Sequence, residues 1–371
     1  MAAPLLTTTY VDPEEGTVGW LVIDELVSGV AAGGLRVCEG ITEAEVAQLA
    51  RNMTRKQRAA GLRVGGAKAG LDMAPSHPAR ARVLGRFLAA LKPFILHCWS
   101  VGPDMNTTMP ELEGIAHELG IPSLKIAIGR NRGLADVEFL RRYALFQAPI
   151  GEFTVNALRP AVAVTASIEV LAERIEPGPA RIAIQGAGNM GGAVAWLLAS
   201  RGFRVVAWSD DEKLLAADEG LDVATLVARR RLGRLPDGPG ESRPSAAILD
   251  LPCDVLVLAA VSRAFPLEAV ARLRAGAVVE AANLALEGEV EDALHLRGIT
   301  VVPDLVASVG GSLAVEALYE GRPERGEDIL QHVARRSTDL VRRLLAESRA
   351  SDRSPCAVAA AWASAPCSAK E

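Results

Sequence analysis

The spacing of apolar residues in the first part of the chain is mostly helical, with a few strand-like runs between. The run Thr17 to Leu26 predicts a strand, which leads toward the tight pair Gly33-Gly34. Thr42 with Glu45 three residues later is a capping-box pattern, and apolar residues then recur at helical spacing. This part is therefore expected to mix helices and strands. Further helices are predicted over 77–92, 109–119, 136–147 and about 157–174, and a strand over Phe94 to Ser100.

From about residue 176 the pattern changes to strand and helix in alternation, after the break EPGP at 176–179. Short apolar strands between helix-sized segments predict a parallel sheet that is buried on both faces. The Pro- and Gly-rich stretch 233–244 is expected to be a loop, 327–347 an amphipathic helix, and the tail from Ser351 poorly ordered. The strands are predicted over 181–185, 204–208, 254–259, 277–280 and 299–302, with a helix that ends near Arg201.

Composition and charge exclude several classes of protein. The 371 residues fit two domains, and 50% hydrophobic with 23% charged residues is ordinary for a globular chain. A net charge of −5 without a basic tract argues against nucleic acid as a partner. The chain start lacks the features of a signal peptide, and the apolar run near 254–261 is too short to span a membrane. Five scattered cysteines are typical of reduced thiols without a metal, so we expect a cytoplasmic protein.

A glycine motif follows the first strand of the alternating part. Residues 186–191 read GAGNMG, and the next strand ends at Asp210. A GxGxxG between strand and helix, with an acidic residue about 20 positions later, is typical of a dinucleotide site. Asp210, or Asp211 beside it, can bind the ribose hydroxyls and would repel a 2′-phosphate, which favours NAD over NADP.

Lysine is scarce, with six residues against 34 arginines, yet Lys68 lies in the glycine-rich run GGAKAG. A buried lysine amine can lose its proton and act as a base, whereas arginine stays charged. Lys56 continues the apolar face of its helix, where a charge needs an anionic partner. A turn lysine at 68 and a snorkelling lysine at 56 are the alternatives. Hydride chemistry also needs an acid or base, for which Asp104 in the loop GPDMNT is the third candidate.

These motifs together resemble the glutamate/leucine/phenylalanine/valine dehydrogenase family over about residues 17–320. The resemblance implies an α/β fold of two domains: a substrate and oligomerisation domain, 1–148, and a Rossmann-type doubly wound NAD domain, 149–320. A C-terminal helix that packs back and a tail follow over 321–371. The motifs that carry it are GGLR at 33–36, MTRK at 53–56, GGAK at 65–68, GPDMNT at 102–107, VAWSD at 206–210, CDVL at 253–256, AAN at 281–283 and VPD at 302–304 before Gly310-Gly311.

The resemblance also implies roles for single residues. Lys56 occupies the position that binds the substrate α-carboxylate, Lys68 that of the catalytic lysine, and Asp104 that of the proton-shuttling carboxylate. The implied reaction is NAD-dependent, reversible oxidative deamination of an L-amino acid in a homo-oligomer. The implied substrate-binding residues also include Ala32, Gly34 and Val315, and the implied cofactor-binding residues are Gly186, Gly188, Asn189, Met190, Gly191, Asp210, Ala260 and Asn283.

The substrate class is predicted from two positions. Glutamate dehydrogenases of this family hold the distal carboxylate with a lysine where this chain has Ala32, and with a serine where it has Val315. An unpaired buried carboxylate would be rejected, so we expect an apolar amino acid such as Leu, Val, Phe or Trp. A glutamate dehydrogenase remains an alternative. The chain departs from the family at 154–157, 283–286 and 307–309, which also leaves open an imine reductase or a non-enzymatic binding protein.

Overall fold

The computed structural model describes residues 3–175, 178–237, 241–261, 263 and 265–365. The chain divides into two compact units, one of Met1–Ala144 with Trp362–Glu371 and one of Leu145–Ala361. Each unit has its own sheet and hydrophobic core. The boundary near residue 144 is close to the expected one near 148, and the long C-terminal helix belongs to the second unit.

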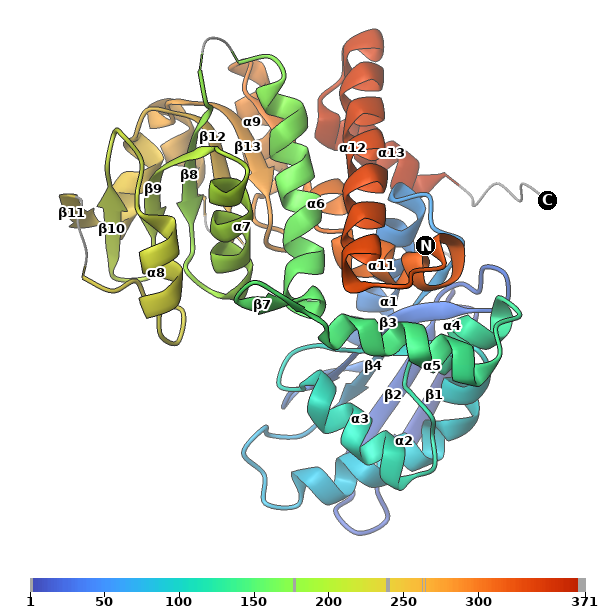
Figure 1. Ribbon diagram of the computed structural model, residues 1–371. Helices are drawn as coiled ribbons and strands as arrows, with labels where there is room; N and C mark the ends of the chain where they lie inside the picture. The colour runs from blue at the N-terminus through green and yellow to red at the C-terminus, as the bar shows by residue number, and fades with distance from the viewer. Residues whose placement is uncertain (1–2, 176–177, 238–240, 262, 264, 366–371) are drawn as a thin grey trace. The chain divides into compact units, whose positions relative to one another are not determined.

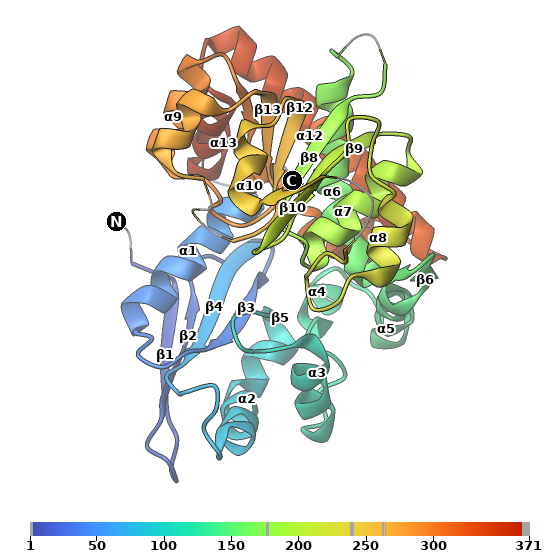
Figure 2. The same ribbon diagram turned by 90° about the vertical axis from the view of Figure 1, so that its left-hand side faces the viewer.

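The first unit contains a five-stranded mixed sheet in the order β1-β2-β4-β3-β5, part of which Figure 2 shows side by side. Strands β3, β4 and β5 are mutually parallel, whereas β2 runs antiparallel to both β1 and β4. The elements are β1 (Leu6–Val11), β2 (Val18–Ile23), β3 (Ala31–Val37), α1 (Glu43–Ala59), β4 (Gly65–Leu71), α2 (Arg80–His97), β5 (Trp99–Pro103), α3 (Met109–Glu118), α4 (Ile126–Asn131) and α5 (Asp136–Ala144).

Helices α1 and α2 pack on opposite faces of this sheet. Residues Ala67, Ala69 and Leu71 of β4 share one core with the buried side chains of α2. The alternate positions face α1, because a Cβ added at Gly66 would lie 2.1 Å from the backbone nitrogen of Thr54. The glycines of β4 therefore let α1 approach the strand closely.

The second unit contains a seven-stranded sheet in the order β11-β10-β9-β8-β12-β13-β14. Strands β9, β8, β12, β13 and β14 are parallel, and β10 and β11 form an antiparallel edge. The strand order reverses between β8 and β12, so this is a doubly wound sheet with a switch point beside β8. Helices α6 and α12 run alongside each other in the same unit, as Figure 1 shows.

The bounds of these elements agree closely with the predicted alternation. The elements are η1 (Leu145–Gln147), β6 (Pro149–Ile150), β7 (Phe153–Thr154), α6 (Val155–Ala172), β8 (Arg181–Gln185), α7 (Asn189–Ser200), β9 (Arg204–Ser209), β10 (Lys213–Ala216), α8 (Val223–Arg229), β11 (Glu241–Pro244), η2 (Ser245–Asp250), β12 (Cys253–Leu258), η3 (Leu267–Arg272), β13 (Ala275–Glu280), α9 (Gly288–Leu296), β14 (Thr300–Val302), α10 (Asp304–Ala307), α11 (Gly310–Glu316), η4 (Ala317–Gly321), α12 (Gly326–Ser351) and α13 (Pro355–Ser364).

The predicted strand over Phe94 to Ser100 is wrong for its first half. Helix α2 continues through Pro93 to His97, and β5 begins only at Trp99. Ile95 is fully buried in the same core as Leu88 and Leu91, so its spacing of four and seven residues from them continues the helical face. Tertiary packing of that face outweighs the local effect of the proline.

Two predictions of irregular structure are also wrong in part. Residues 241–244 of the expected loop form the edge strand β11, which pairs with β10, while 238–240 lie outside the described residues. The expected disordered tail forms α13 up to Ser364, where Cys356, Val358 and Ala363 are buried. An alanine-rich segment that buries these side chains gains packing that composition alone does not reveal. The last residues, 366–371, lie outside the described part of the chain.

Helix α6 is long and apolar enough to cross a membrane by length and composition. Two thirds of that window is buried, and the helix packs against α7, α11 and α12 within its own unit. A core helix of a globular domain passes the same test, so α6 carries no argument for a membrane span.

Candidate active site and cofactor site

Lys68 lies on the face of the first sheet that α1 partly covers. Its antiparallel partner in β2 is Val22, which packs with Val46 and Ala50 of α1. Ala67 and Ala69 on either side point into the opposite core, as alternation along a strand requires. The Lys68 residue is 7% exposed, so this amine is buried and does not belong to a surface turn.

Asp104 and Arg36 complete an ionic cluster around this amine. The Lys68 Nζ lies 2.7 Å from Oδ2 of Asp104, and Arg36 Nε donates to the same oxygen at 2.8 Å. Arg36 also pairs with Glu45 of α1 at 3.2 Å. One carboxylate oxygen therefore joins the two cations. The sequence assigned Lys68 and Asp104 to the site, but Arg36 received no role although it lies in the GGLR motif.

The loop after β5 holds Asp104 at this point. The Asp104 backbone nitrogen donates to Thr107 Oγ1 at 2.9 Å, and Thr107 Oγ1 donates to the carbonyl of Leu35 at 2.8 Å. A Cβ at Gly34 would lie 2.9 Å from the Cβ of Asp104 and 2.8 Å from the carbonyl oxygen of Pro103. Glycine at 34 is thus required for the loop to approach β3.

Burial sets the protonation of the pair. Burial lowers the pKa of Lys68, the Asp104 carboxylate opposes this, and the charge of Arg36 adds to the lowering, with a net pKa below the ordinary lysine value. Burial works to raise the pKa of Asp104, but the charges and hydrogen bonds of Lys68 and Arg36 outweigh it and hold that pKa below its usual value. A lysine whose amine deprotonates more readily than usual, next to a carboxylate that stays ionised, is suited to proton transfer.

Three of the other expected substrate residues lie in α1 and β3, the elements beside the strand β4 that carries Lys68. Lys56 lies in the last turn of α1, the helix that packs on β4, and is half-buried. Gly34 and Ala32 lie in β3, beside β4 in the sheet, and both alternate with core-facing residues of that strand. Val315 lies in α11 of the second unit and is buried.

The glycine turn after β8 fits a dinucleotide. Gly186 has φ +103°, and a Cβ there would lie 2.7 Å from the Ala259 carbonyl oxygen. A Cβ at Gly191 would lie 1.9 Å from the Gly186 carbonyl oxygen, whereas one at Gly188 would meet nothing within 4 Å. The three glycines therefore serve the tight turn, the close helix–strand packing and an open approach for a diphosphate at the N-terminus of α7.

Asp210 lies at the carboxyl end of β9, but its carboxylate is largely engaged by the backbone. One oxygen accepts from the nitrogens of Glu212 and Lys213 at 2.9 and 2.8 Å, and the other accepts from Leu235 at 2.7 Å. The residue is 8% exposed. Asp211 is exposed and forms an ion pair with Arg234 at 3.2 Å. The acidic pair is at the expected edge, with Asp211 the more accessible of the two.

Arg230, which the sequence gave no role, lies against the glycine turn. Its guanidinium donates to the Gly188 carbonyl at 3.0 Å and occupies the space in which a Cβ at Gly192 would stand. Burial lowers the pKa of Arg230. A half-buried cation beside the positive end of α7 favours an anion there. The remaining expected cofactor residues are Asn189 and Met190 at the start of α7, Ala260 after β12 and Asn283 after β13, of which only Met190 is half-buried and the others are exposed.

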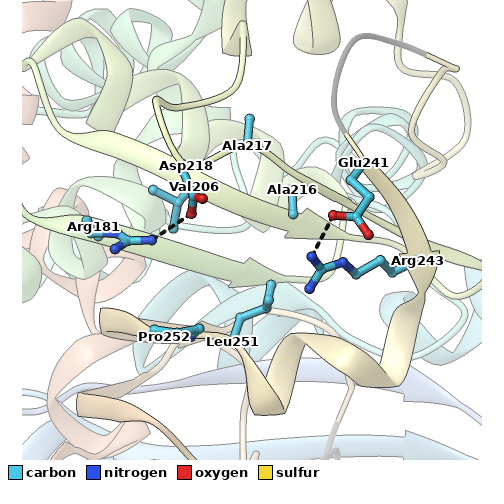
Figure 3. Close-up of a pocket in the computed structure, with 9 residues that line it drawn as sticks. All are labelled: Arg181, Val206, Ala216, Ala217, Asp218, Glu241, Arg243, Leu251 and Pro252. Atoms are coloured by element: carbon cyan, nitrogen blue, oxygen red, sulfur yellow. Dashed lines mark hydrogen bonds and ion pairs between the residues drawn. The ribbon is translucent and has the colours of Figure 1, made fainter.

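Two other polar groups of the second unit received no role from the sequence. A pocket at the amino-terminal edge of its sheet is lined by the ion pairs Arg181–Asp218 and Arg243–Glu241, as Figure 3 shows. Ligands of doubly wound sheets bind at the opposite edge, so this pocket is not the cofactor site.

In the second group a ligand atom from each of Glu280, Glu291 and Cys356 lies within 4.8 Å of the others; Glu280 and Cys356 are buried and Glu291 is half-buried. Burial, with the charges of Asp304 and Glu291, raises the pKa of Glu280 to about 9. The burial that raises this pKa favours the neutral, protonated form of the Glu280 carboxyl group. Cys253, expected to be a core residue, is buried in the core of the second unit.

Two family models match the chain along most of its length. The model described as Glu/Leu/Phe/Val dehydrogenase, dimerisation domain, matches residues 8–120, and Glutamate/Leucine/Phenylalanine/Valine dehydrogenase matches 160–363. The chain belongs to this family. The resemblance inferred from its motifs and the predicted two-domain α/β fold are thereby confirmed.

Curated relatives and solved structures agree with this assignment. NADP-specific glutamate dehydrogenase A1 of Halobacterium salinarum is 32% identical over 76% of this chain and 67% of its own length. Glutamate dehydrogenase of Thermotoga maritima is 31% identical over 79% and 70%. The hetero-hexameric glutamate dehydrogenase of Thermus thermophilus, in its Leu-bound form, has a TM-score of 0.74 and 27% identity, covering 97% of this chain and 87% of that one.

A more distant structure shows the fold alone. The L-tryptophan dehydrogenase of Nostoc punctiforme has a TM-score of 0.65 at 19% identity, over 97% of this chain and 94% of that one. From the family and its relatives, the protein is an amino acid dehydrogenase, an oxidoreductase that acts on CH–NH2 groups with a nicotinamide cofactor.

Proposed function

We propose that the protein catalyses the reversible oxidative deamination of an L-amino acid to its 2-oxo acid and ammonia, with chemistry at Lys68. The observation that carries the proposal is the buried Lys68–Asp104 ion pair at 2.7 Å, in which the lysine pKa is lowered. When bound, the nicotinamide accepts a hydride from the substrate α-carbon. Every other step requires proton transfers that this pair can perform.

Substrate binding and the proton transfers are assigned to residues of the first unit. Lys56 binds the substrate α-carboxylate as an ammonium. Neutral Lys68 takes a proton from the water that attacks the α-carbon of the substrate imine, and as an ammonium it stabilises the carbinolamine oxygen. The Asp104 carboxylate first takes a proton from the substrate ammonium group and later returns it to the amino group of the carbinolamine. Ammonia then leaves as the hydroxyl loses its proton to water, and the 2-oxo acid forms. Arg36 keeps Asp104 ionised and oriented through the 2.8 Å contact with its Oδ2.

Two classes of amino acid are candidates for the substrate. Ala32 and Val315 offer no polar anchor, which supports an apolar substrate such as Leu, Val, Phe or Trp. An acidic substrate is the second candidate, supported by the relatives named glutamate dehydrogenase and by Lys125, whose ammonium lies against Gly102 of β5.

For the cofactor we propose NAD, because the acidic pair Asp210 and Asp211 at the end of β9 would repel a 2′-phosphate. We further propose that the protein is a homo-oligomer, which the match to a dimerisation domain supports, and that it works in the cytoplasm.

Arg230 is expected to contribute to cofactor affinity through the diphosphate. Arg230→Met should weaken binding of NAD⁺ and of ADP by about tenfold, because it removes one charge-assisted contact of roughly 1.5 kcal/mol. Titration calorimetry measures both ligands. Arg229→Met, the adjacent residue of α8, is the matched control. Equal affinities for wild type and Arg230→Met would contradict this role.

The test of the proposed function is a screen of purified protein for NAD⁺ and NADP⁺ reduction with the standard L-amino acids. The reverse reaction is followed with 2-oxo acids, with and without ammonia. Activity that depends on ammonia supports deamination. Cofactor oxidation with a preformed imine alone would favour the imine reductase hypothesis, and dinucleotide binding without any turnover would favour a binding protein.

A further inference from the structure

Three side chains that can bind a metal ion meet at the carboxyl end of β13. Glu280 is the last residue of β13, Glu291 lies in α9 and Cys356 lies in α13, and both helices are labelled in Figure 2. One ligand atom of each residue lies within 4.8 Å of those of the other two. All three belong to the second unit, and none has a role in the chemistry proposed for Lys68.

The protein satisfies only one oxygen of the Glu280 carboxyl group. Its Oε2 accepts from the backbone nitrogen of Leu286 at 3.0 Å, whereas its Oε1 is buried without a hydrogen-bond partner in the described part of the chain. The residue is 1% exposed. A buried carboxylate oxygen that accepts no hydrogen bond is costly, so Oε1 requires a partner that the protein itself does not supply.

The groups that Glu280 faces are acceptors as well. Its carboxyl group lies against that of Glu291, and Glu291 also lies against the Cys356 thiol. Two carboxylates form a hydrogen bond only when a proton lies between them. Burial raises the pKa of both glutamates, and the negative charge of Asp304 adds to this in each. The cluster is therefore completed either by protons or by one cation that the three groups share.

The three ligand atoms favour zinc as that cation. A thiolate with two carboxylates combines a soft ligand with hard ones, which Zn²⁺ accepts, whereas Mg²⁺ and Ca²⁺ take oxygen ligands. Zn–S and Zn–O bonds of about 2.3 and 2.1 Å place tetrahedral ligand atoms roughly 3.5 Å apart. Small side-chain movements would bring atoms within 4.8 Å to this spacing. Glu291 is half-buried, which leaves an entry for the ion and room for water as the fourth ligand.

We propose that Glu280, Glu291 and Cys356 bind one structural Zn²⁺, which fastens α9 and α13 to the carboxyl end of β13. The sequence did not indicate this site, because the ligands come from three distant segments and lack the short spacings of zinc motifs. Binding displaces the protons of the thiol and the glutamates, so zinc affinity should rise with pH. The proposal is independent of the reaction at Lys68.

A zinc ion here would also account for the order of the chain end. Composition predicted a poorly ordered tail from Ser351, yet α13 is formed, and Cys356 belongs to the same apolar core as Val290 and Leu294 of α9. A bond from the ion to Cys356 adds a link between α13 and this core that composition does not reveal. Zinc should therefore stabilise the folded second unit, because the unfolded chain does not hold the three ligands together.

The first experiment needs no variant. Full-length protein is treated with EDTA, dialysed and titrated with ZnCl₂ by calorimetry, and elemental analysis counts the metal. We expect one Zn²⁺ per chain, and a rise in the thermal unfolding midpoint of about 5 °C or more at 100 times the Kd. Co²⁺ in place of zinc should give the near-ultraviolet charge-transfer band of a thiolate ligand. If the protein binds neither metal, protons alone complete the cluster and the proposal is overturned.

The second experiment places the ion with variants that keep side-chain size. Loss of an outer partner of a metal ligand costs 10–100-fold in affinity, so Cys356→Ser and Glu291→Gln should each weaken zinc binding by about 100-fold or more. Cys356→Ser should also lose the cobalt band. The matched controls are Cys98→Ser in the first unit and Glu289→Gln at an exposed position of α9, and both should bind zinc like wild type.

The variants overturn the site in a way that the first experiment does not. Circular dichroism and NADH binding show whether Cys356→Ser and Glu291→Gln fold. Folded variants that bind zinc with wild-type affinity would place the ion elsewhere and overturn the assignment. Loss of zinc binding in both variants, with retention in both controls, would support it.

Discussion

Replacing Lys68 by alanine is expected to abolish oxidative deamination and leave dinucleotide binding unchanged. The amine at 68 is buried, 2.7 Å from the Asp104 carboxylate, and its pKa is lowered by burial. In the proposed mechanism it supplies both the base for water attack and the charge that stabilises the carbinolamine. Loss of a group with two such roles should reduce kcat by about 10³-fold or more. Steady-state NAD⁺ reduction measures the loss, and calorimetry with NADH measures cofactor affinity.

Lys68→Arg separates the two roles of this lysine. Arginine keeps a positive charge beside Asp104 but does not lose its proton, so it cannot act as a base. The arginine variant is therefore expected to be nearly as inactive as the alanine variant. Lys92→Ala controls for the loss of a lysine elsewhere in the same unit. Substantial deamination by either Lys68 variant, with correct folding shown by circular dichroism, would refute the assigned role.

The candidate residues of this site could be proposed from the sequence because they carry local signals. A lysine among glycines in a chain that prefers arginine marks position 68, and the loop around Asp104 has its own recognisable residues. The glycine turn at 186–191 was predictable for the same reason, since a strand, a turn and a helix in succession each have sequence signatures. The parallel sheet followed from short apolar strands between helical segments.

What the sequence did not reveal depends on contacts between distant segments. Arg36 and Asp104 are 68 positions apart, and their hydrogen bond follows from the pairing of β3 with β5. The sequence did not reveal that Lys125 lies near Gly102, because this contact depends on the pairing of the segment around Leu124 with β5. Likewise, the carboxylate of Asp210 was expected to face a ribose, but three backbone nitrogens already donate to it.

The pH dependence of deamination should move in opposite directions when Asp104 and Arg36 are replaced. Deamination requires neutral Lys68, so the rate rises with pH through the pKa of this lysine. Asp104 raises that pKa and Arg36 lowers it. Asp104→Asn should therefore shift the acid limb of the kcat/KM profile to lower pH, and Arg36→Gln should shift it to higher pH.

The two variants also differ in the height of the plateau above that limb. Asp104→Asn removes the carboxylate that transfers a proton to the amino group, so its plateau should fall by about 10²-fold. Arg36→Gln keeps this carboxylate, and its plateau should fall much less. Glu45→Gln, which changes only the outer partner of Arg36, serves as the control with a nearly unchanged profile. Shifts of the same sign in the two variants would mean that the limb reports a group other than Lys68, and the proton transfers would then have to be assigned anew.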